Sequence, residues 1–375
     1  VLTKANLTFH NITAMGITNQ RETTIVWDKN TGMPVAPAIV WQSRQSADIC
    51  NALSKHQNMI HKKTGLLINP YFSASKIRYI LDNLPNGQER ADAGELMFGT
   101  VDSWLIYKLT NETRHVTDIT NASRTMLFNI NTLEWDDDIL KLFNIPRSML
   151  PEVLASADYF GETSYFHNTI PITGVAGDQQ AALFGQMCLK PGDAKNTYGT
   201  GCFMLMNIGD KVQLSKNGLL TTVAWKINGK VTYALEGSVF MGGASVQWLR
   251  DQLKLFKNAA DTENMAYKAQ QNDSIYFVPA FVGLGTPYWD DNARGAVFGL
   301  TREAGRHELA RATLEAIAYQ SRDVFDVMIK ESKQDLKVLS VDGGASVNNY
   351  LMQFQADILN TTIRVPKIYE TTSLG

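Results

Sequence analysis

The sequence predicts an α/β protein with two domains, and three observations support this prediction. The chain has 375 residues, which is more than one ordinary hydrophobic core accommodates. An apolar run that ends in a glycine turn and continues into a helical pattern occurs in both halves, at 171–180 and at 337–346. Lys190-Pro191-Gly192-Asp193 interrupts the pattern between them, so we expect one domain over 1–187 and a second over 188–375.

The first half opens with strand patterns and continues with helical ones. Residues 14–17 are predicted to form a strand that leads into a polar turn. Apolar runs at 23–27 and 37–41 flank a turn-forming cluster at 28–32, which favours a β-hairpin. Residues 43–115 follow a mostly helical periodicity.

The second half is predicted to alternate strands and helices. Strands are expected near 194–208, 218–226, 230–235 and 337–341, and helices over about 242–256 and 307–331. An apolar stripe that includes Leu309, Ala316 and Val324 predicts the longer of these two helices.

Composition and charge exclude several classes of protein. Lys and Arg number 35 against 37 Asp and Glu, so no basic footprint indicates nucleic acid or a polybasic membrane patch. No apolar run is long enough to span a membrane and no signal peptide is recognisable, so membrane insertion is not expected. Cys50, Cys188 and Cys202 form no CxxC pair and no even disulfide set, which favours a reducing, cytoplasmic compartment.

Asp178 is the first candidate catalytic residue. It follows an apolar run, at the point where α/β sheets place their ligands. A carboxylate there can accept a proton from an alcohol or hold a metal ion through water. An Asp that caps a helix beginning near Gln179 is the more frequent outcome for such a residue, so both interpretations stay open on this residue alone.

Two glycine turns are candidate phosphate-binding elements. Gly199-Thr200-Gly201 lies between apolar runs, and its backbone amides could face phosphate oxygens, although a tight hairpin turn explains the same pattern. Asp342-Gly343-Gly344 follows the strand predicted at 337–341, with Asn348 shortly after it, and an ordinary strand-to-helix connection explains this pattern equally well. GxGxxG and GxxxxGK[ST] are absent, so neither a dinucleotide fingerprint nor a P-loop is supported.

Other candidate residues carry weak signals when each is taken singly. Arg21 and Glu22 follow the strand at 14–17 and could bind polyol hydroxyls as donor and acceptor, but a solvated loop looks the same. Trp41 ends an apolar run and is typical of a core, and Tyr71, which follows Pro70, is uninformative by itself. The six histidines show no metal-ligand spacing.

Taken together, segments along the whole chain resemble one family. These segments are Gly16–Thr24, Ile39–Gln42, Gly177–Gly185, Asn196–Phe203, Phe281–Trp289 and Val341–Ala345. In this order they resemble the glycerol-phosphorylating members of the FGGY carbohydrate kinases, and the resemblance covers essentially all 375 residues.

The resemblance implies an actin/hexokinase-like (ribonuclease H-like) ATPase fold, with two α/β domains around a cleft. It implies ATP-dependent phosphorylation of glycerol to sn-glycerol 3-phosphate, with Asp178 as the general base. Side chains expected to bind the glycerol hydroxyls are Arg21, Glu22, Tyr71, Asp178 and Gln179, and those expected to wall its carbon chain are Trp41 and Phe203.

The same resemblance implies the cofactors and the assembly. Positions that match ATP-contacting residues of the family are Thr200, Gly201, Gly243, Gln247, Gly344 and Asn348. Mg²⁺ is expected to bridge the phosphates, with Asp178 reaching it through water. A homo-oligomer, either a dimer or a tetramer, is also expected.

The chain departs from the family pattern at both ends. The Asp-x-Gly-Thr-Thr-Ser strand and turn that opens the family is missing, and Leu374-Gly375 stops where the family continues into a helix. We therefore expect a fragment, truncated in both domains. Two alternatives stay open: an FGGY kinase for another small polyol or sugar, and a catalytically incomplete fragment that acts only as a binding module.

Overall fold

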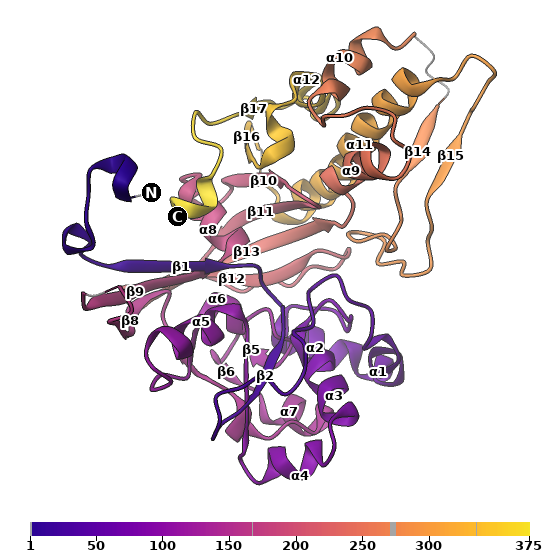
Figure 1. Ribbon diagram of the computed structural model, residues 1–375. Coiled ribbons are helices and arrows are strands. Elements are labelled where there is room, and N and C mark those ends of the chain that lie inside the picture. Colours follow the sequence, from indigo (N-terminus) through magenta and orange to yellow (C-terminus); the bar gives the residue numbers. More distant parts are fainter. Residues whose placement is uncertain (1, 167, 271–274, 335) are drawn as a thin grey trace. The chain divides into compact units, whose positions relative to one another are not determined.

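The computed structural model describes residues 2–166, 168–270, 275–334 and 336–375. They divide into two units (Figure 1). Unit 1 comprises Val1–Gln180, Asp210–Leu214 and Thr221–Tyr233, and unit 2 comprises Ala181–Gly209, Ser215–Leu220 and Ala234–Gly375. Both units contain strands and helices, so the predicted α/β class is confirmed.

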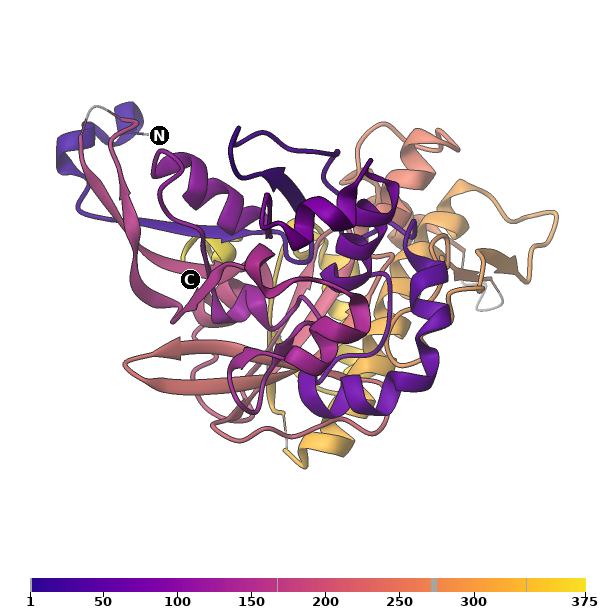
Figure 2. The ribbon, with the colours of Figure 1, turned by 90° about the horizontal axis from the view of Figure 1, so that it is seen from below.

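Unit 1 is organised around a three-stranded sheet with the order β1-β9-β8. The central strand β9 (Ile170–Gly177) is parallel to β1 (Met15–Asn19) and antiparallel to β8 (Ala157–Thr163). Figure 2 shows the indigo β1 beside the magenta β8 and β9. Apolar side chains from this sheet and its neighbours form a core cluster of Ile17, Ile106, Val116, Phe160, Ile172 and Val175.

Short elements make up the rest of unit 1. The strands are β2 (Ile25–Asp28), β3 (Leu96–Gly99), β4 (Val116–Asp118), β5 (Phe128–Asn129), β6 (Glu134–Trp135) and β7 (Glu152–Leu154). The helices are α1 (Ala47–Ala52), α2 (Gln57–Thr64), α3 (Ser73–Asn83), α4 (Gly87–Asp92), α5 (Val101–Leu109), α6 (Ile119–Ala122) and α7 (Asp137–Phe143). The helical region predicted over 43–115 therefore also contains β3, which the sequence pattern missed.

The hairpin predicted from 23–27 and 37–41 is present but irregular. Antiparallel bridges join Thr24 to Ile39 and Trp27 to Pro34 across the turn, whereas the regular antiparallel ladder of β2 is formed with β3. Pro34 precedes this run and Pro37 begins it, and proline has no backbone N–H to donate to a ladder. This explains why the second apolar run does not become a strand.

A six-stranded sheet with the order β12-β13-β11-β10-β16-β17 contains most of the strand residues of unit 2. Its members are β12 (Leu220–Ile227), β13 (Lys230–Val239), β10 (Ala194–Tyr198), β11 (Cys202–Gly209), β16 (Val338–Asp342) and β17 (Thr362–Arg364). The boundary between the units runs through β12 and β13. β10 and β11 form an antiparallel hairpin, and β16 is parallel to β10, so the strands predicted in this half are present.

Helices complete unit 2. The remaining elements are α8 (Asp178–Gly185, which begins in unit 1), α9 (Gly243–Asp251), α10 (Asp261–Lys268), α11 (Arg306–Ser332), α12 (Asn349–Leu359) and the strands β14 (Tyr276–Val278) and β15 (Ala296–Phe298). α11 confirms the predicted long helix, whereas α9 ends before the predicted residue 256. Ile317 and Met328 of α11 belong to the same buried cluster as Leu339 and Val341 of β16.

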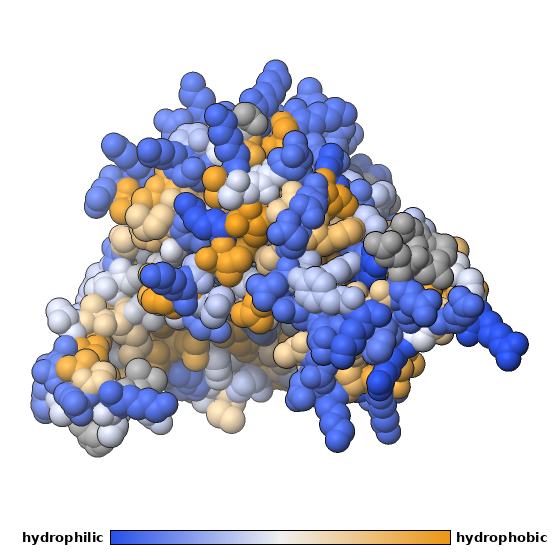
Figure 3. Space-filling model, turned by 90° about the horizontal axis from the view of Figure 1, so that it is seen from above, coloured by the Kyte–Doolittle hydropathy of each residue, from blue (hydrophilic) through white to orange (hydrophobic). Residues whose placement is uncertain are grey.

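The surface mixes polar and apolar side chains. Hydrophilic residues cover much of the face shown in Figure 3, with hydrophobic ones visible between them. Among the helices in the described part of the chain, none is both long and apolar enough to cross a membrane.

His115 is a buried imidazole in unit 1 that makes stability depend on pH. Its Nε2 donates to the Phe98 carbonyl at 2.7 Å, and its ring packs edge-on against Trp27. Burial, helped by Lys29, lowers the pKa of His115 to about 4, although the hydrogen bond to Phe98 acts in the opposite direction. In the unfolded chain its pKa returns to about 6.5, so between these values the unfolded state binds one more proton.

We expect the neutral imidazole to stabilise the fold fully above about pH 6.5. This contribution to the free energy of unfolding, up to about 3 kcal/mol, is lost as the pH falls to about 4. In His115→Gln the amide still donates but does not titrate, so the fall in urea midpoint between pH 7 and pH 4.5 should be shallower. The control is His10→Gln, at an exposed position, which should keep the wild-type slope. Identical slopes in all three proteins would contradict this assignment.

Candidate active site

Two parallel strands of unit 1 bring together residues far apart in the sequence. β1 and β9 remain paired to their ends, with Asn19 opposite Gly177. Arg21 follows β1 closely, and Asp178 follows β9 directly. As a result Arg21 Nε lies 3.4 Å from Asp178 Oδ1.

Gly177 makes this close approach sterically feasible. A Cβ atom at Gly177 would lie 2.7 Å from both Cγ and Cδ of Arg21. The Gly177 N–H donates to Thr120 Oγ1 at 2.9 Å, and Arg21 Nη1 donates to Gln180 Oε1 at 3.2 Å. Thr120 therefore holds the end of β9 in place, and Gln180 holds the Arg21 guanidinium.

Asp178 combines a helix-terminal role with an accessible carboxylate. It is the first residue of α8, its Oδ1 accepts from the Gln179 backbone N–H at 2.8 Å, and its Oδ2 accepts from Gln179 Nε2 at 3.1 Å. Its side chain is 33% exposed, whereas those of Arg21 and Glu22 are 1% and 2% exposed. The capping and catalytic interpretations of Asp178 are thus compatible with each other.

Glu22 is buried and held in an uncommon backbone conformation. Its φ of 58° lies in the left-handed region, which non-glycine residues seldom adopt. Its Oε1 accepts from Arg124 Nε at 2.7 Å and lies 3.8 Å from Arg21 Nε. Arg124 is itself fully buried, so a buried cation compensates the charge of the Glu22 carboxylate.

The three aromatic residues predicted to contact substrate, Trp41 and Phe203 as walls and Tyr71 at a hydroxyl, are divided between the units. In unit 1, the rings of Trp41 and Tyr71 meet edge to face, with centroids 5.8 Å apart and planes at 72°. Tyr71 is buried and its N–H donates to Asn69 Oδ1 at 2.9 Å. Phe203 lies on β11 in unit 2 and is buried.

A cavity of about 490 Å³ opens in unit 2 where β10 and β16 end. The two strands are parallel and pair up to Thr197 and Asp342, so the turns that follow them lie at the same sheet edge. Five of the six residues predicted to contact nucleotide line this cavity: Thr200, Gly243, Gln247, Gly344 and Asn348. The sixth, Gly201, lies in the turn next to Thr200, outside the lining.

The turn after β10 is fixed against the start of α9. The carbonyl of Gly199 accepts from the Gly243 N–H at 2.8 Å, and that of Thr200 accepts from the N–H groups of Gly242 and Ala244 at 2.9 and 3.1 Å. A Cβ at Gly243 would lie 2.7 Å from the Gly199 oxygen. These glycines therefore let the turn and the helix meet backbone to backbone.

The turn after β16 is equally close to its neighbour. Gly343 has a φ of 85°, and a Cβ there would lie 2.6 Å from the Tyr198 oxygen. Asn348 caps α12, because its Oδ1 accepts from the Leu351 N–H at 3.0 Å, and its Nδ2 donates to Thr262 Oγ1 at 3.2 Å. The Asn348 side chain is thus pre-oriented at the cavity wall.

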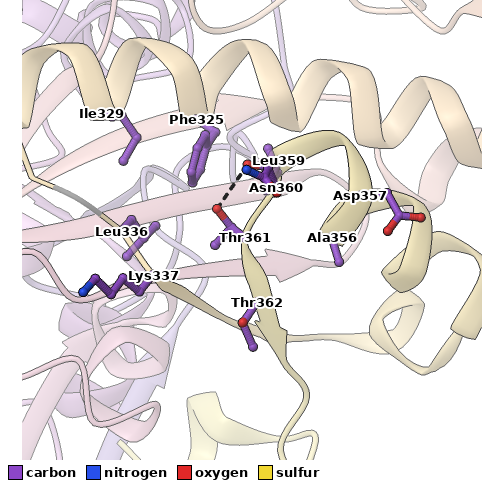
Figure 4. Close-up of a pocket in the computed structure, with 10 residues that line it drawn as sticks. All are labelled: Phe325, Ile329, Leu336, Lys337, Ala356, Asp357, Leu359, Asn360, Thr361 and Thr362. Carbon is purple, nitrogen blue, oxygen red and sulfur yellow. Dashed lines mark hydrogen bonds between the residues drawn. The ribbon is translucent and has the colours of Figure 1, made fainter.

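A second cavity in unit 2, of about 780 Å³, contains none of the predicted residues. Figure 4 shows its lining, which comes from the ends of α11 and α12 and from the starts of β16 and β17. Thr361 Oγ1 donates to the Leu359 carbonyl across its rim at 3.1 Å. It offers no arrangement of charged groups comparable to that around Asp178.

Sequence reasoning missed several residues at both sites. In unit 1 these are Lys76 and Arg124, whose contacts reach Glu22. In unit 2, Arg250 and Glu263 line the cavity of about 490 Å³. One feature of the sequence could have indicated that Lys76 is buried. It lies four residues before Ile80, and this spacing places both side chains on the buried face of α3. Arg124 follows no periodic pattern that would have marked it.

Comparisons with known proteins place the whole chain in one family. Residues 1–185 match the N-terminal domain of the FGGY family of carbohydrate kinases, and residues 194–375 match its C-terminal domain. The chain is 59% identical to a glycerol kinase of Shewanella frigidimarina, covering 100% of this chain and 76% of the relative. It is also 59% identical to a glycerol kinase of Lactobacillus acidophilus, covering 97% and 74%.

Solved structures agree with this family. A crystal structure of Plasmodium falciparum glycerol kinase with ADP aligns with a TM-score of 0.86 at 43% identity, covering 97% of this chain and 73% of that one. A gluconate kinase of Lactobacillus acidophilus aligns with a TM-score of 0.82 at 23% identity, covering 97% and 74%, and at this identity it indicates the fold alone. The predicted actin/hexokinase-like architecture is thereby confirmed, and the chain belongs to the FGGY family of carbohydrate kinases.

Proposed function

We propose that this protein phosphorylates glycerol with ATP and releases sn-glycerol 3-phosphate and ADP. The observation that carries the proposal is the convergence of Arg21, Glu22 and Asp178 at the in-register ends of β1 and β9. This convergence occurs in a chain that is 59% identical to glycerol kinases over its full length.

The chemistry of the unit 1 cluster suits a small polyol. Each hydroxyl of glycerol both donates and accepts, and the cluster offers a donor in Arg21 beside acceptors in Glu22 and Asp178. Gln179 supplies an amide that both donates and accepts. We assign the walls around the carbon chain to Trp41 and Phe203, and we assign the Tyr71 hydroxyl to one substrate oxygen. Walls of this kind exclude larger sugars by shape.

We assign Asp178 as the general base. The terminal hydroxyl oxygen of glycerol attacks the γ-phosphorus of ATP, the bond from that phosphorus to the β-bridging oxygen breaks, and ADP leaves. The hydroxyl proton passes to the Asp178 carboxylate, which is the accessible member of the cluster. Arg21 holds this carboxylate in place, and positioning of this kind is most of what phosphoryl transfer requires from a protein.

We assign the nucleotide to the cavity in unit 2. Because the first amides of α9 already donate to Gly199 and Thr200, we assign the phosphate contacts to the Thr200 hydroxyl and the Gly201 amide. The remaining predicted residues, Gly243, Gln247, Gly344 and Asn348, would contact the rest of ATP.

Mg²⁺ is the metal that fits this donor set. Within the described ranges, no group of three or more His, Cys, Asp or Glu residues forms a protein-only metal cage. Mg²⁺ suits such a site, because it keeps several waters and binds one or two carboxylates together with substrate phosphates. Asp178 would hold it through water. The ion would neutralise the phosphate charge.

Two further expectations belong to this proposal. Cys50, Cys188 and Cys202 are buried thiols rather than disulfides, which is consistent with a cytoplasmic location. We also propose a homo-oligomer, either a dimer or a tetramer. Sedimentation velocity measures the oligomeric state directly, and a monomer at micromolar concentration would overturn the proposed homo-oligomer.

The proposed substrate is tested with a panel of polyols and sugars. ADP release should show its highest kcat/KM with glycerol, because the walls exclude longer chains. Preference for a four- or five-carbon substrate would instead support an FGGY kinase of another specificity. Binding of glycerol without ADP release, also after the chain is extended to the length of its relatives, would support a binding module.

Asp178→Asn should lower kcat by at least about a hundredfold, since it removes the general base. ADP affinity, measured by calorimetry, should remain at the wild-type value, because the nucleotide cavity lies in unit 2. The matched control is Asp158→Asn, at an exposed position on β8, which should retain wild-type turnover. Full activity of Asp178→Asn would refute the role of this carboxylate.

Gly344→Ala tests the nucleotide assignment. A Cβ at Gly344 meets no atom within 4 Å, so the fold should tolerate the methyl group, which is added to a residue of the cavity wall. ADP affinity should fall roughly tenfold. Gly174→Ala is the control, because its Cβ also meets no atom within 4 Å and its position lies on β9 in unit 1. Equal ADP affinities in both variants would contradict the assignment.

A further inference from the structure

Lys76 is a fully buried cation that joins two segments of the proposed glycerol site. It lies in the first turn of α3, and its Nζ donates to the backbone carbonyls of Glu22 at 3.0 Å and of Tyr71 at 2.7 Å. Glu22 follows β1 and Tyr71 precedes α3, so a single ammonium group ties together two otherwise separate loops.

The Glu22 carbonyl receives an unusual number of donors. In addition to Lys76, it accepts from Ser73 Oγ at 3.2 Å and from Thr24 Oγ1 at 3.2 Å. A left-handed conformation at a residue such as Glu is strained and persists only where the surroundings enforce it. The three donors hold the carbonyl of a residue whose φ is 58°.

A second buried cation holds the other end of the same residue. Arg124 Nε donates to Glu22 Oε1 at 2.7 Å, while the Arg124 guanidinium lies 5.7 Å from the centre of the Tyr71 ring. Lys76 and Arg124 thus contact the backbone and side chain of Glu22, and each of them also contacts Tyr71. The direction of the Glu22 carboxylate is set before any ligand arrives.

Overall stability alone does not explain a lysine at this position. Removing an ammonium group from water is costly, and an apolar side chain of similar length commonly serves stability as well or better. Burial lowers the pKa of Lys76 to about 7, even though the Glu22 carboxylate and the Cys50 thiol act in the opposite direction. Retention of such a group is easier to understand if it orients residues that bind substrate.

We propose that Lys76 is a positioning residue for glycerol, acting through the backbone of Glu22 and Tyr71 without contacting substrate. This rests on the proposed function, because it presumes that Glu22 and Tyr71 bind the polyol. Loss of Lys76 should therefore weaken glycerol binding specifically, since the nucleotide residues lie in unit 2.

The test compares Lys76→Met with Arg78→Met. Arg78 lies on the same helix, and its bonds to Asp82 and to the Asn144 carbonyl stay away from the glycerol residues. Calorimetry and steady-state kinetics should show the glycerol Kd and KM raised about tenfold or more in Lys76→Met, with the ATP KM unchanged. Arg78→Met should alter neither constant. An unchanged glycerol KM, or a parallel rise in both KM values, would overturn the proposal.

Two further variants cover the case in which Lys76→Met does not fold. Lys76→Gln keeps a neutral hydrogen-bond donor at this position, so its glycerol affinity should be lower than that of the wild type but not abolished. Ser73→Ala removes a weaker donor to the same carbonyl and should raise the glycerol KM by a few-fold, again without changing the ATP KM. No change in glycerol KM in either variant would count against positioning through Glu22.

Failure of the proposed function would be visible separately. If the wild-type protein neither binds nor phosphorylates glycerol, the function falls, and the same variants are then measured with the polyol that the wild type prefers. A selective rise in the KM of that polyol in Lys76→Met would support positioning, and a parallel rise in the ATP KM would overturn it.

Discussion

The site in unit 1 depends on one constraint, which is the register of β1 against β9. Both strands end together, with Asn19 opposite Gly177. A slip of one residue in this pairing would displace Arg21 by about 3.3 Å along the strand direction relative to Asp178. Gly177 adds a steric condition, since any side chain there would collide with the stem of Arg21. The pairing of the two strands therefore places the Arg21 guanidinium, a hydrogen-bond donor, beside the Asp178 carboxylate.

Buried polar contacts behind the strand ends hold this register. Asn121 and Asn19 exchange amide hydrogen bonds at 3.0 and 3.1 Å, while Thr120 Oγ1 accepts from the Gly177 N–H. Asp118 caps this segment at the start of α6 by accepting the backbone N–H groups of Thr120 and Asn121. Burial, with the neighbouring Asp102, raises the pKa of Asp118 to about 7. One short helix therefore fixes the ends of both strands.

Sequence patterns predicted features that depend on local residues. The glycine turn before Asp178, the hairpin around Thr200 and the long helix α11 follow from periodicity and turn chemistry over short stretches. The pairing of β2 with β3 was missed because strand partners are chosen by non-local packing, whereas the predicted nearer arm forms only isolated bridges such as that between Thr24 and Ile39. Lys76 and Arg124 were missed because their contacts lie with loops distant in the sequence. The roles of Trp41 and Phe203 came from family resemblance, since their patterns alone indicated only a core.

A crystal structure of the protein with glycerol tests the central claim most directly. We expect glycerol oxygens within about 3.2 Å of the Arg21 guanidinium and the Glu22 carboxylate, with a terminal hydroxyl donating to Asp178. Glycerol bound elsewhere, or oriented with both terminal hydroxyls away from Asp178, would contradict it.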